Sequence, residues 1–199
     1  MSRDWIHGEK RITWNWIIRD FSFRIVLYIL IPILAMKFLG FTLKDFGLNQ
    51  PTNLQWLMTI VLAVITFIAC LFFRDTSKKP HHRKPIRDFW FSMYLVLINS
   101  PTEEFFYRGF LLVFFDRFFG NPLIGVAVSS FLFGIQHTIF FGASFRTVLF
   151  DTFGGFILAF AYIFLGRCLI LVIVIHAVSN LALFTIGKYI LNKPQRSRE

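Results

Sequence analysis

Acidic residues are scarce in this chain, which has 11 Asp and Glu against 21 Lys and Arg. Charged residues of both signs make up only 16% of the sequence, whereas soluble domains average about 25%. Together with 56% hydrophobic residues and 28 phenylalanines, this scarcity excludes an ordinary soluble domain and an intrinsically disordered chain. The composition fits a protein whose surroundings are lipid.

Cysteine is almost absent too. The two cysteines, Cys70 and Cys168, show no CxxC spacing, which excludes a disulfide framework and a cysteine-ligated zinc site. We expect both to be inert thiols in an apolar interior. The chain also lacks the HExxH signature of common zinc proteases and the GxSxG signature of serine hydrolases.

The hydrophobic residues are gathered in long runs. Each run is near the roughly 20 residues that a helix needs to cross about 30 Å of hydrocarbon. None alternates polar and apolar positions, which disfavours a membrane β-barrel. The sequence therefore predicts an all-α fold, a polytopic membrane bundle of about six transmembrane helices in a single domain, residues 1–199. The predicted spans are residues 25–43, 54–73, 89–115, 122–141, 148–165 and 169–187.

The polar segment before the first span has no apolar core followed by small residues, so we expect no cleavable signal. Within it, residues 10–23 mix Trp, Ile and Phe with Arg and Asp, which is typical of a short helix in the membrane interface. We therefore assign residues 1–24 to a cytoplasmic and interfacial segment, and residues 89–187 to the helices that carry the chemistry.

The basic residues are distributed unevenly. Of the 21 Lys and Arg, five precede the first span, six lie in residues 74–87 and four follow the last span. By the positive-inside rule, both termini and the 74–88 loop are expected in the cytoplasm, near anionic lipid headgroups. His81 and His82 belong to this loop and are expected to be solvated. Nucleic-acid binding is not expected, because the basic residues are divided among short loops.

Charged residues interrupt the third predicted span, where the adjacent Glu103 and Glu104 are followed by Arg108. A charged side chain at the centre of a bilayer costs roughly 2.5–3.5 kcal/mol on insertion scales, so this group needs partners or a water-filled cavity. Pro101 removes a backbone donor and is expected to kink the helix here. The two glutamates are therefore the leading candidates for a functional site.

The two glutamates occupy different faces of the predicted helix. Glu104 and Arg108 are four residues apart, which allows them to form an ion pair with a supporting role. Glu103 is rotated by about 100° and lacks such a partner, so we expect it to face a cavity and act as a general base. In the plainer interpretation, both glutamates only hold helices together.

Two histidines lie in later predicted spans. His137 follows Phe133 by four residues, and His176 precedes Asn180 by four, so each pair shares a helix face. Two donors such as His176 and Asn180 on one face can stabilise an oxyanion. A lone membrane histidine more often makes an interhelical hydrogen bond than takes part in chemistry. Gly134 allows another helix to approach closely.

The motifs EExxxR, FxxxH and HxxxN, in this order on separate spans, resemble the CPBP family of membrane proteases, which includes CAAX prenyl endopeptidases and bacteriocin-processing proteins. The resemblance implies that Glu103 activates a water, that His137 helps to hold this water, and that His176 and Asn180 stabilise the tetrahedral intermediate. It further implies a glutamic-type intramembrane endopeptidase in a bacterial plasma membrane. Its substrate would be a membrane-associated protein or peptide.

Other interpretations stay open from the sequence. Glu103, His137 and His176 could bind Zn²⁺ with water in the open position, although Asn180 suits an oxyanion better than zinc, so no cofactor is expected. A catalytically silent scaffold or immunity protein is disfavoured because unused buried charges only destabilise a fold. A transporter is disfavoured because no duplicated halves are found.

Three further polar residues in the predicted spans are given structural roles. Asp151 is expected to pair with Arg146 near the cytoplasmic edge rather than to line the cavity. Ser129 and Ser130 are expected to be helix-packing positions, and a serine mechanism is not favoured.

Overall fold

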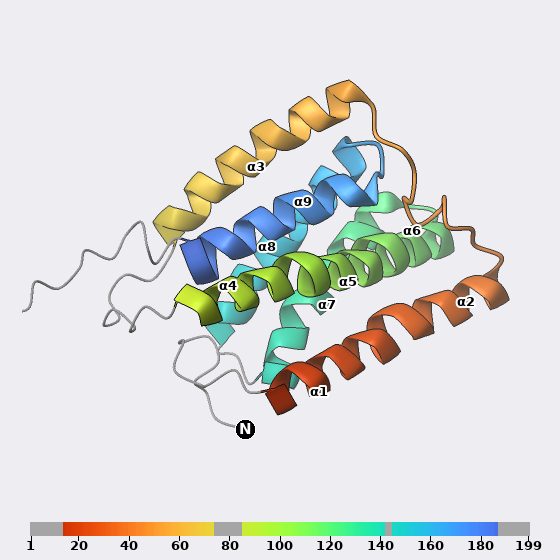
Figure 1. Ribbon diagram of the computed structural model, residues 1–199. Helices are drawn as coiled ribbons and strands as arrows, with labels where there is room; N and C mark the ends of the chain where they lie inside the picture. The colour runs from red at the N-terminus through yellow and green to blue at the C-terminus, as the bar shows by residue number, and fades with distance from the viewer. Residues whose placement is uncertain (1–13, 74–84, 142–144, 187–199) are drawn as a thin grey trace, which may run out of the picture.

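The computed structural model describes residues 14–73, 85–141 and 145–186 (Figure 1). Every regular element in these residues is a helix, which confirms the predicted all-α fold. Both chain ends and the loop with His81 and His82 lie outside the described residues, so their cytoplasmic position stays a prediction.

Three of the helical stretches are built from several elements that follow one another without a break. The elements are α1 (Trp14–Arg24), η1 (Ile25–Leu30), α2 (Ile31–Leu39), α3 (Asn53–Phe73), α4 (Pro85–Tyr94), η2 (Leu95–Asn99), α5 (Ser100–Glu104), η3 (Phe105–Leu112), α6 (Val113–Phe119), α7 (Pro122–Phe141), α8 (Phe145–Phe164), α9 (Leu169–Asn180) and η4 (Leu181–Thr185), where η marks π-helix. In Figure 1 the continuous α4–α6 helix runs between the α1–α2 helix on one side and α9 on the other, and α3 packs against α9.

The described helices overlap all six predicted spans, although the first helix begins and ends earlier than predicted. Three are long and apolar enough to cross a membrane: Ile17–Leu39, Asn53–Phe72 and Phe145–Phe164. Two shorter apolar helices, Pro122–His137 and Leu169–Thr185, coincide with two further predicted spans. The remaining predicted span, 89–115, lies within the long α4–α6 helix, whose middle carries both glutamates and Arg108.

The N-terminal helix differs from the prediction of a separate interfacial helix. Residues 14–23 are helical, but α1 continues through η1 into α2, and the candidate span begins at Ile17. Asp20 and Arg24, whose charge suggested a place at the interface, are instead buried with 6% and 3% of their surface exposed. Because neighbouring helices cover these two side chains, the polar end of the helix is compatible with the bundle interior.

A glycine ends this first long helix earlier than predicted. The apolar run continues to residue 43, but α2 stops at Leu39, and Gly40 adopts the left-handed conformation with φ 68°. Its N–H donates to the carbonyl of Met36, a common way to close a helix.

Wide helical turns accommodate Pro101 in the α4–α6 helix. The N–H of Ser100 reaches back five residues to the carbonyl of Leu95, and the Ser100 hydroxyl donates to the same oxygen at 2.9 Å. The expected disturbance at Pro101 therefore takes the form of a π-helical turn, η2, immediately before α5, with a second, η3, immediately after it. Such turns are frequent at functional sites, and here they bracket Glu103 and Glu104.

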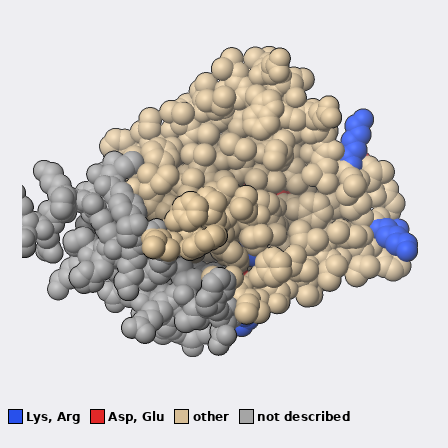
Figure 2. All heavy atoms as spheres, viewed as in Figure 1, with Lys and Arg blue, Asp and Glu red and all other residues tan. Residues whose placement is uncertain are grey.

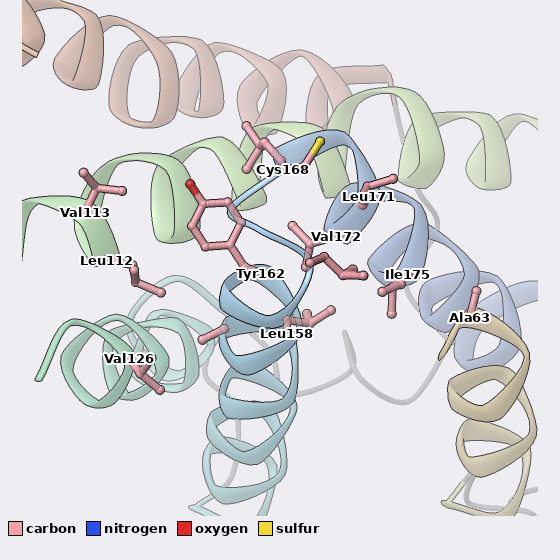
Figure 3. Packing of buried hydrophobic residues seen from close by; sticks show 13 residues of the cluster. Ala63, Leu112, Val113, Val126, Leu158, Tyr162, Cys168, Leu171, Val172 and Ile175 are labelled. Atoms are coloured by element: carbon pink, nitrogen blue, oxygen red, sulfur yellow. The ribbon is translucent and has the colours of Figure 1, made fainter. Parts of the chain in front are cut away.

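The apolar core lies where α3, η3, α6, α7, α8 and α9 meet (Figure 3). Leu112, Val172 and Tyr162 are fully buried there, and Cys168 belongs to the same cluster. Cys168 and Cys70 are both buried and free, as expected of thiols in an apolar interior.

Small residues bring α7 and α8 close together. A Cβ added to Gly134 would lie 1.9 Å from Oγ1 of Thr152 and 2.7 Å from the carbonyl of Val148, so only glycine fits. Gly155 on α8 packs in the same way against the backbone of Ser130. These contacts confirm the close helix approach predicted at Gly134 and the packing role predicted for Ser130.

Large apolar side chains cover much of the outer surface. Phe38 on α2 and Phe72 on α3 are more than 80% exposed, at 85% and 84%. Apart from its right-hand edge, where Lys and Arg side chains stand out, the face seen in Figure 2 shows very little charge. Such a surface is stable in lipid and would not be stable in water.

Candidate active site

Glu104 and Arg108 form a fully buried ion pair in the middle of the α4–α6 helix. Nη1 of Arg108 lies 3.0 Å from Oε1 of Glu104, and both side chains are 0% exposed. Nη2 of Arg108 donates to the carbonyl of Gly155 on α8 at 3.0 Å. The pair has the geometry predicted from the i, i+4 spacing, and it also ties α8 to the α4–α6 helix.

Glu104 has a second partner, His176 on α9, which the sequence analysis did not foresee. Nδ1 of His176 lies 2.5 Å from Oε1 of Glu104, within a short charge-assisted hydrogen bond. Nε2 of the same ring lies 3.8 Å from Oε2 of Glu103. His176 is therefore placed between the two glutamates.

Glu103 is not the unpaired carboxylate that helical spacing predicted. Its Oε1 accepts hydrogen bonds from Nη1 of Arg24 at 2.8 Å and from Nδ2 of Asn99 at 3.0 Å. Glu103 is 3% exposed. The prediction considered partners on the same helix only, whereas Arg24 comes from α1, 79 residues away in the sequence. Oε2 is left as the oxygen that faces His176.

Arg24 is part of a chain of buried polar groups. Its Nε donates to Oδ2 of Asp20 at 2.7 Å, one helical turn earlier on α1. The same Asp20 oxygen accepts a hydrogen bond from the hydroxyl of Tyr94 on α4. Tyr94, Asp20, Arg24 and Glu103 thus form one connected chain from α4 through α1 to α5.

Asn180 lies one turn after His176 on α9, as predicted, and is buried at 7% exposure. Its Nδ2 donates to Oδ1 of Asn99 at 3.1 Å and to Oγ of Ser100 at 3.2 Å. Because Asn99 also donates to Glu103, it links Glu103 to the predicted oxyanion donor Asn180. Asn99 was not singled out from the sequence.

His137 lies on α7 with 23% of its side chain exposed. Its Nδ1 lies 2.9 Å from the carbonyl of Phe133 and 3.5 Å from Oδ2 of Asp151. The prediction that Asp151 pairs with Arg146 is wrong: Arg146 is exposed, and no ion pair joins these two described residues. Asp151 sits one and a half turns further along α8, where the close α7–α8 contact turns it towards His137.

Phe133, the first residue of the FxxxH motif, packs its ring against both histidines and Arg108. Its ring centroid lies 5.4 Å from that of His137 and 5.9 Å from that of His176, both edge to face. The guanidinium carbon of Arg108 lies 4.6 Å from the centre of the same ring. Phe133 therefore contacts residues from all three motifs and separates the two imidazoles.

The sequence contains only a weak indication of the site residues that the sequence analysis missed, namely Asp20, Arg24 and Asn99. Asp20 and Arg24 are four residues apart, and so are Asn99 and Glu103, which marks pairs on one helix face. The spacing could have indicated these pairs, but not the contact between Arg24 and Glu103, which depends on how two helices pack.

The arrangement of the described residues does not support the alternative of a zinc site. The described residues contain no group of three His, Cys, Asp or Glu side chains placed to hold one metal ion. Arg24 already occupies Oε1 of Glu103, and Arg108 already occupies Oε1 of Glu104. The negative charge of the two glutamates is thus met by guanidinium groups.

Comparison with protein families matches residues 85–182 to a model described as type II CAAX prenyl endopeptidase Rce1-like. No curated protein and no solved structure matches the chain. The matched residues include Glu103, His137, His176 and Asn180. They leave out the α1–α2 helix, and with it Arg24.

Proposed function

The chain belongs to the CAAX-type family of intramembrane proteases, and we propose that it cuts its substrate with a water molecule activated by Glu103. One observation carries this assignment. Glu103 is buried, one of its oxygens is held by Arg24 and Asn99, and the other faces His176. A carboxylate fixed through one oxygen offers the second oxygen, in a defined direction, as a proton acceptor.

The proposed reaction balances its protons through Glu103. A water attacks the carbonyl carbon of the peptide bond and gives one proton to Oε2 of Glu103, while His137 helps to hold the water. The tetrahedral intermediate then collapses, the C–N bond breaks, and the leaving amine takes the proton back from Glu103. General base and general acid are thus the same group, and each transfer contributes about 10²–10⁴-fold to the rate.

His176 and Asn180 would stabilise the oxyanion. Glu104 holds Nδ1 of His176, which leaves Nε2, on the side of Glu103, as the ring nitrogen that would donate to the oxyanion. The Asn180 amide donates to Asn99 and Ser100 in this structure. The substrate carbonyl would therefore replace one of these two acceptors when it binds.

We propose that the reaction needs no metal. Arg24 and Arg108 supply the positive charge next to the two glutamates that a metal ion would otherwise supply. Activity of the purified protein should then survive prolonged treatment with phenanthroline. Stoichiometric zinc, with activity lost on its removal and restored on its return, would contradict this proposal.

The substrate is proposed to be a membrane-associated protein or peptide, such as a prenylated protein ending in a CAAX sequence, a bacteriocin or pheromone precursor, or a sorted C-terminal tail. The family name and the apolar helices support this class. We further propose a bacterial plasma membrane with both termini in the cytoplasm, since the basic residues lie at the ends and in one loop.

A labelled-water experiment tests the proposal. The protein in lipid nanodiscs is incubated with a farnesylated CAAX peptide, and separately with bacteriocin precursors, in H₂¹⁸O, and the products are analysed by mass spectrometry. One ¹⁸O should enter the new carboxylate, and Glu103→Gln should slow cleavage at least about 100-fold. Asp45→Asn, which removes an exposed carboxylate elsewhere, is the control. Full activity of Glu103→Gln would contradict the proposal.

A further inference from the structure

The N-terminal helix contacts the active site through a charged side chain, although it lies outside the family match. Arg24 on α1 is 3% exposed and reaches Glu103 on α5 with its Nη1 at 2.8 Å. A buried arginine in a membrane protein requires partners, and such residues are usually functional. A helix that served only as an anchor would not need one.

The guanidinium of Arg24 is held from two sides. Nε is bound by Asp20 at 2.7 Å, and Asp20 is in turn bound by the hydroxyl of Tyr94. Nη1 is bound by Glu103, with the hydroxyl of Thr102 3.5 Å away. Because a guanidinium is planar and rigid, fixing Nε also fixes the direction in which Nη1 points. The position of Glu103 is thus set by groups on α1 and α4 together with Asn99 on η2.

Tyr28 docks the same helix a second time, one turn after Arg24. Its ring stacks on Phe106 with a centroid distance of 4.8 Å. Its hydroxyl contacts Oε1 of Gln136 on α7, which also accepts from the Tyr107 hydroxyl at 2.9 Å. Two successive turns of the N-terminal helix are therefore fixed against the helices that carry the motifs, and Arg24 is positioned by packing as well as by Asp20.

We propose that Arg24 is a positioning residue for the general base, so that the N-terminal helix completes the active site. Arg24, together with Asn99, binds Oε1 of Glu103, which leaves Oε2 turned towards His176. This inference rests on the role of Glu103 under the proposed function. Asp20 and Tyr94 contribute by orienting Arg24.

If the proposal is correct, the side chain at position 24 must carry a guanidinium group that can bind Asp20 and Glu103 at once. A lysine carries the same charge but a single nitrogen, so it cannot bridge Asp20 and Glu103 with the geometry of a guanidinium. Arg24→Lys should therefore retain part of the activity, and Arg24→Met should lose most of it. Arg19→Met is the matched control, because Arg19 lies on the same helix but is exposed.

Steady-state kinetics with a fluorescence-quenched farnesylated CAAX peptide provide the first readout. Arg24→Met should lower kcat about 100-fold with little change in KM, because a misplaced base affects the chemical step more than binding. Ethylguanidinium added to Arg24→Ala, whose shortened side chain leaves room for it, should restore part of kcat. Arg19→Met should behave as the wild type in both conditions.

Chemical labelling provides a readout that needs no substrate. Dicyclohexylcarbodiimide modifies protonated carboxyl groups in apolar surroundings, and peptide mass mapping locates the modified residue. Loss of Arg24 should increase labelling of Glu103 several-fold at neutral pH, while labelling of Glu104, which keeps Arg108, stays the same. Arg19→Met should leave both labels unchanged.

The outcomes separate this inference from the proposed function. If Glu103→Gln is inactive but Arg24→Met matches Arg19→Met in kcat and in Glu103 labelling, the inference is wrong and the proposed function stands. If Glu103→Gln is active, the proposed function is wrong. Should Arg24→Met fail to fold, Tyr94→Phe removes only the hydroxyl that holds Asp20. That variant should lower kcat several-fold at constant KM, and unchanged kcat would overturn the inference.

Discussion

The ion pairs in the middle of the bundle and those at the loop end, near residues 40–52, have similar distances but very different surroundings (Figure 1). Arg108 and Glu104 are 3.0 Å apart with both side chains 0% exposed. Arg117 and Asp45 are 2.5 Å apart with 50% and 25% exposed. Distance therefore does not reveal how much an ion pair contributes. Solvent screens the outer pair, whereas breaking the inner pair leaves a charge buried without a partner.

The largest expected effect comes from breaking the inner pair on one side. Arg108→Met leaves Glu104 buried with His176 alone, so it should lower the free energy of unfolding by about 3–5 kcal/mol. Thermal unfolding in detergent, together with the yield of inserted protein, measures this effect.

The double variant Arg108→Met with Glu104→Gln sharpens the same comparison. It removes both charges, so it should be less destabilised than Arg108→Met alone. A single variant as stable as the wild type would show that water or another group compensates the charge.

An intermediate effect is expected at Asn180, which is neutral but lies in the same buried region. Asn180→Ala should lower kcat about 10²–10³-fold, the usual loss when one oxyanion donor is removed, with little change in the melting temperature. Ser179→Ala is the control, because its hydroxyl donates to the carbonyl of Ile175 on its own helix at 2.8 Å. Equal kcat values for the two variants would speak against an oxyanion role for Asn180.

The smallest effect is expected at the outer pair. Arg117→Met should change the free energy of unfolding by at most about 1 kcal/mol, because solvent reaches half of the Arg117 side chain and a quarter of the Asp45 side chain. Hydrogen bonds from Thr42 hold the pKa of the Asp45 carboxyl below its ordinary value, and Arg117 acts in the same direction.

A carboxyl with a lowered pKa in the folded protein stabilises the fold above its unfolded pKa, and this contribution is lost as the pH falls through the folded pKa. The small stability difference between Asp45→Asn and the wild type should therefore be present at pH 7, begin to decrease as the pH falls below about 4, and vanish only below the lowered pKa of the folded protein. Melting curves across this range would contradict the assignment if the difference grew on acidification.

Sequence patterns were sufficient wherever the relevant contact lies within one helix. The lengths of the apolar runs predicted the helices, and the i, i+4 spacing predicted the pair of Glu104 with Arg108. The small side chain of Gly134 predicted the close approach of α7 and α8. All three depend on periodicities that a single helix imposes on its own residues.

Contacts between distant helices escaped the same reasoning. Arg24 reaches Glu103, and His176 reaches Glu104, across 79 and 72 residues of sequence. Which helices become neighbours is decided by packing over the whole bundle, so no local pattern contains these partners. Asp151 shows the same effect: a partner nearby in sequence, Arg146, was expected, and the packing of α8 on α7 brings it to His137 instead.

The most direct test of the account compares the two adjacent glutamates in one experiment. Glu103→Gln and Glu104→Gln are assayed for peptide cleavage and for melting temperature in the same lipid nanodiscs. Glu103→Gln should keep a melting temperature near that of the wild type, because Asp20 still neutralises Arg24, and should lose at least about 99% of the activity. Glu104→Gln should melt at a clearly lower temperature, because Arg108 loses its buried partner. Equal loss of activity at unchanged melting temperature in both variants would contradict the division between a catalytic and a supporting glutamate.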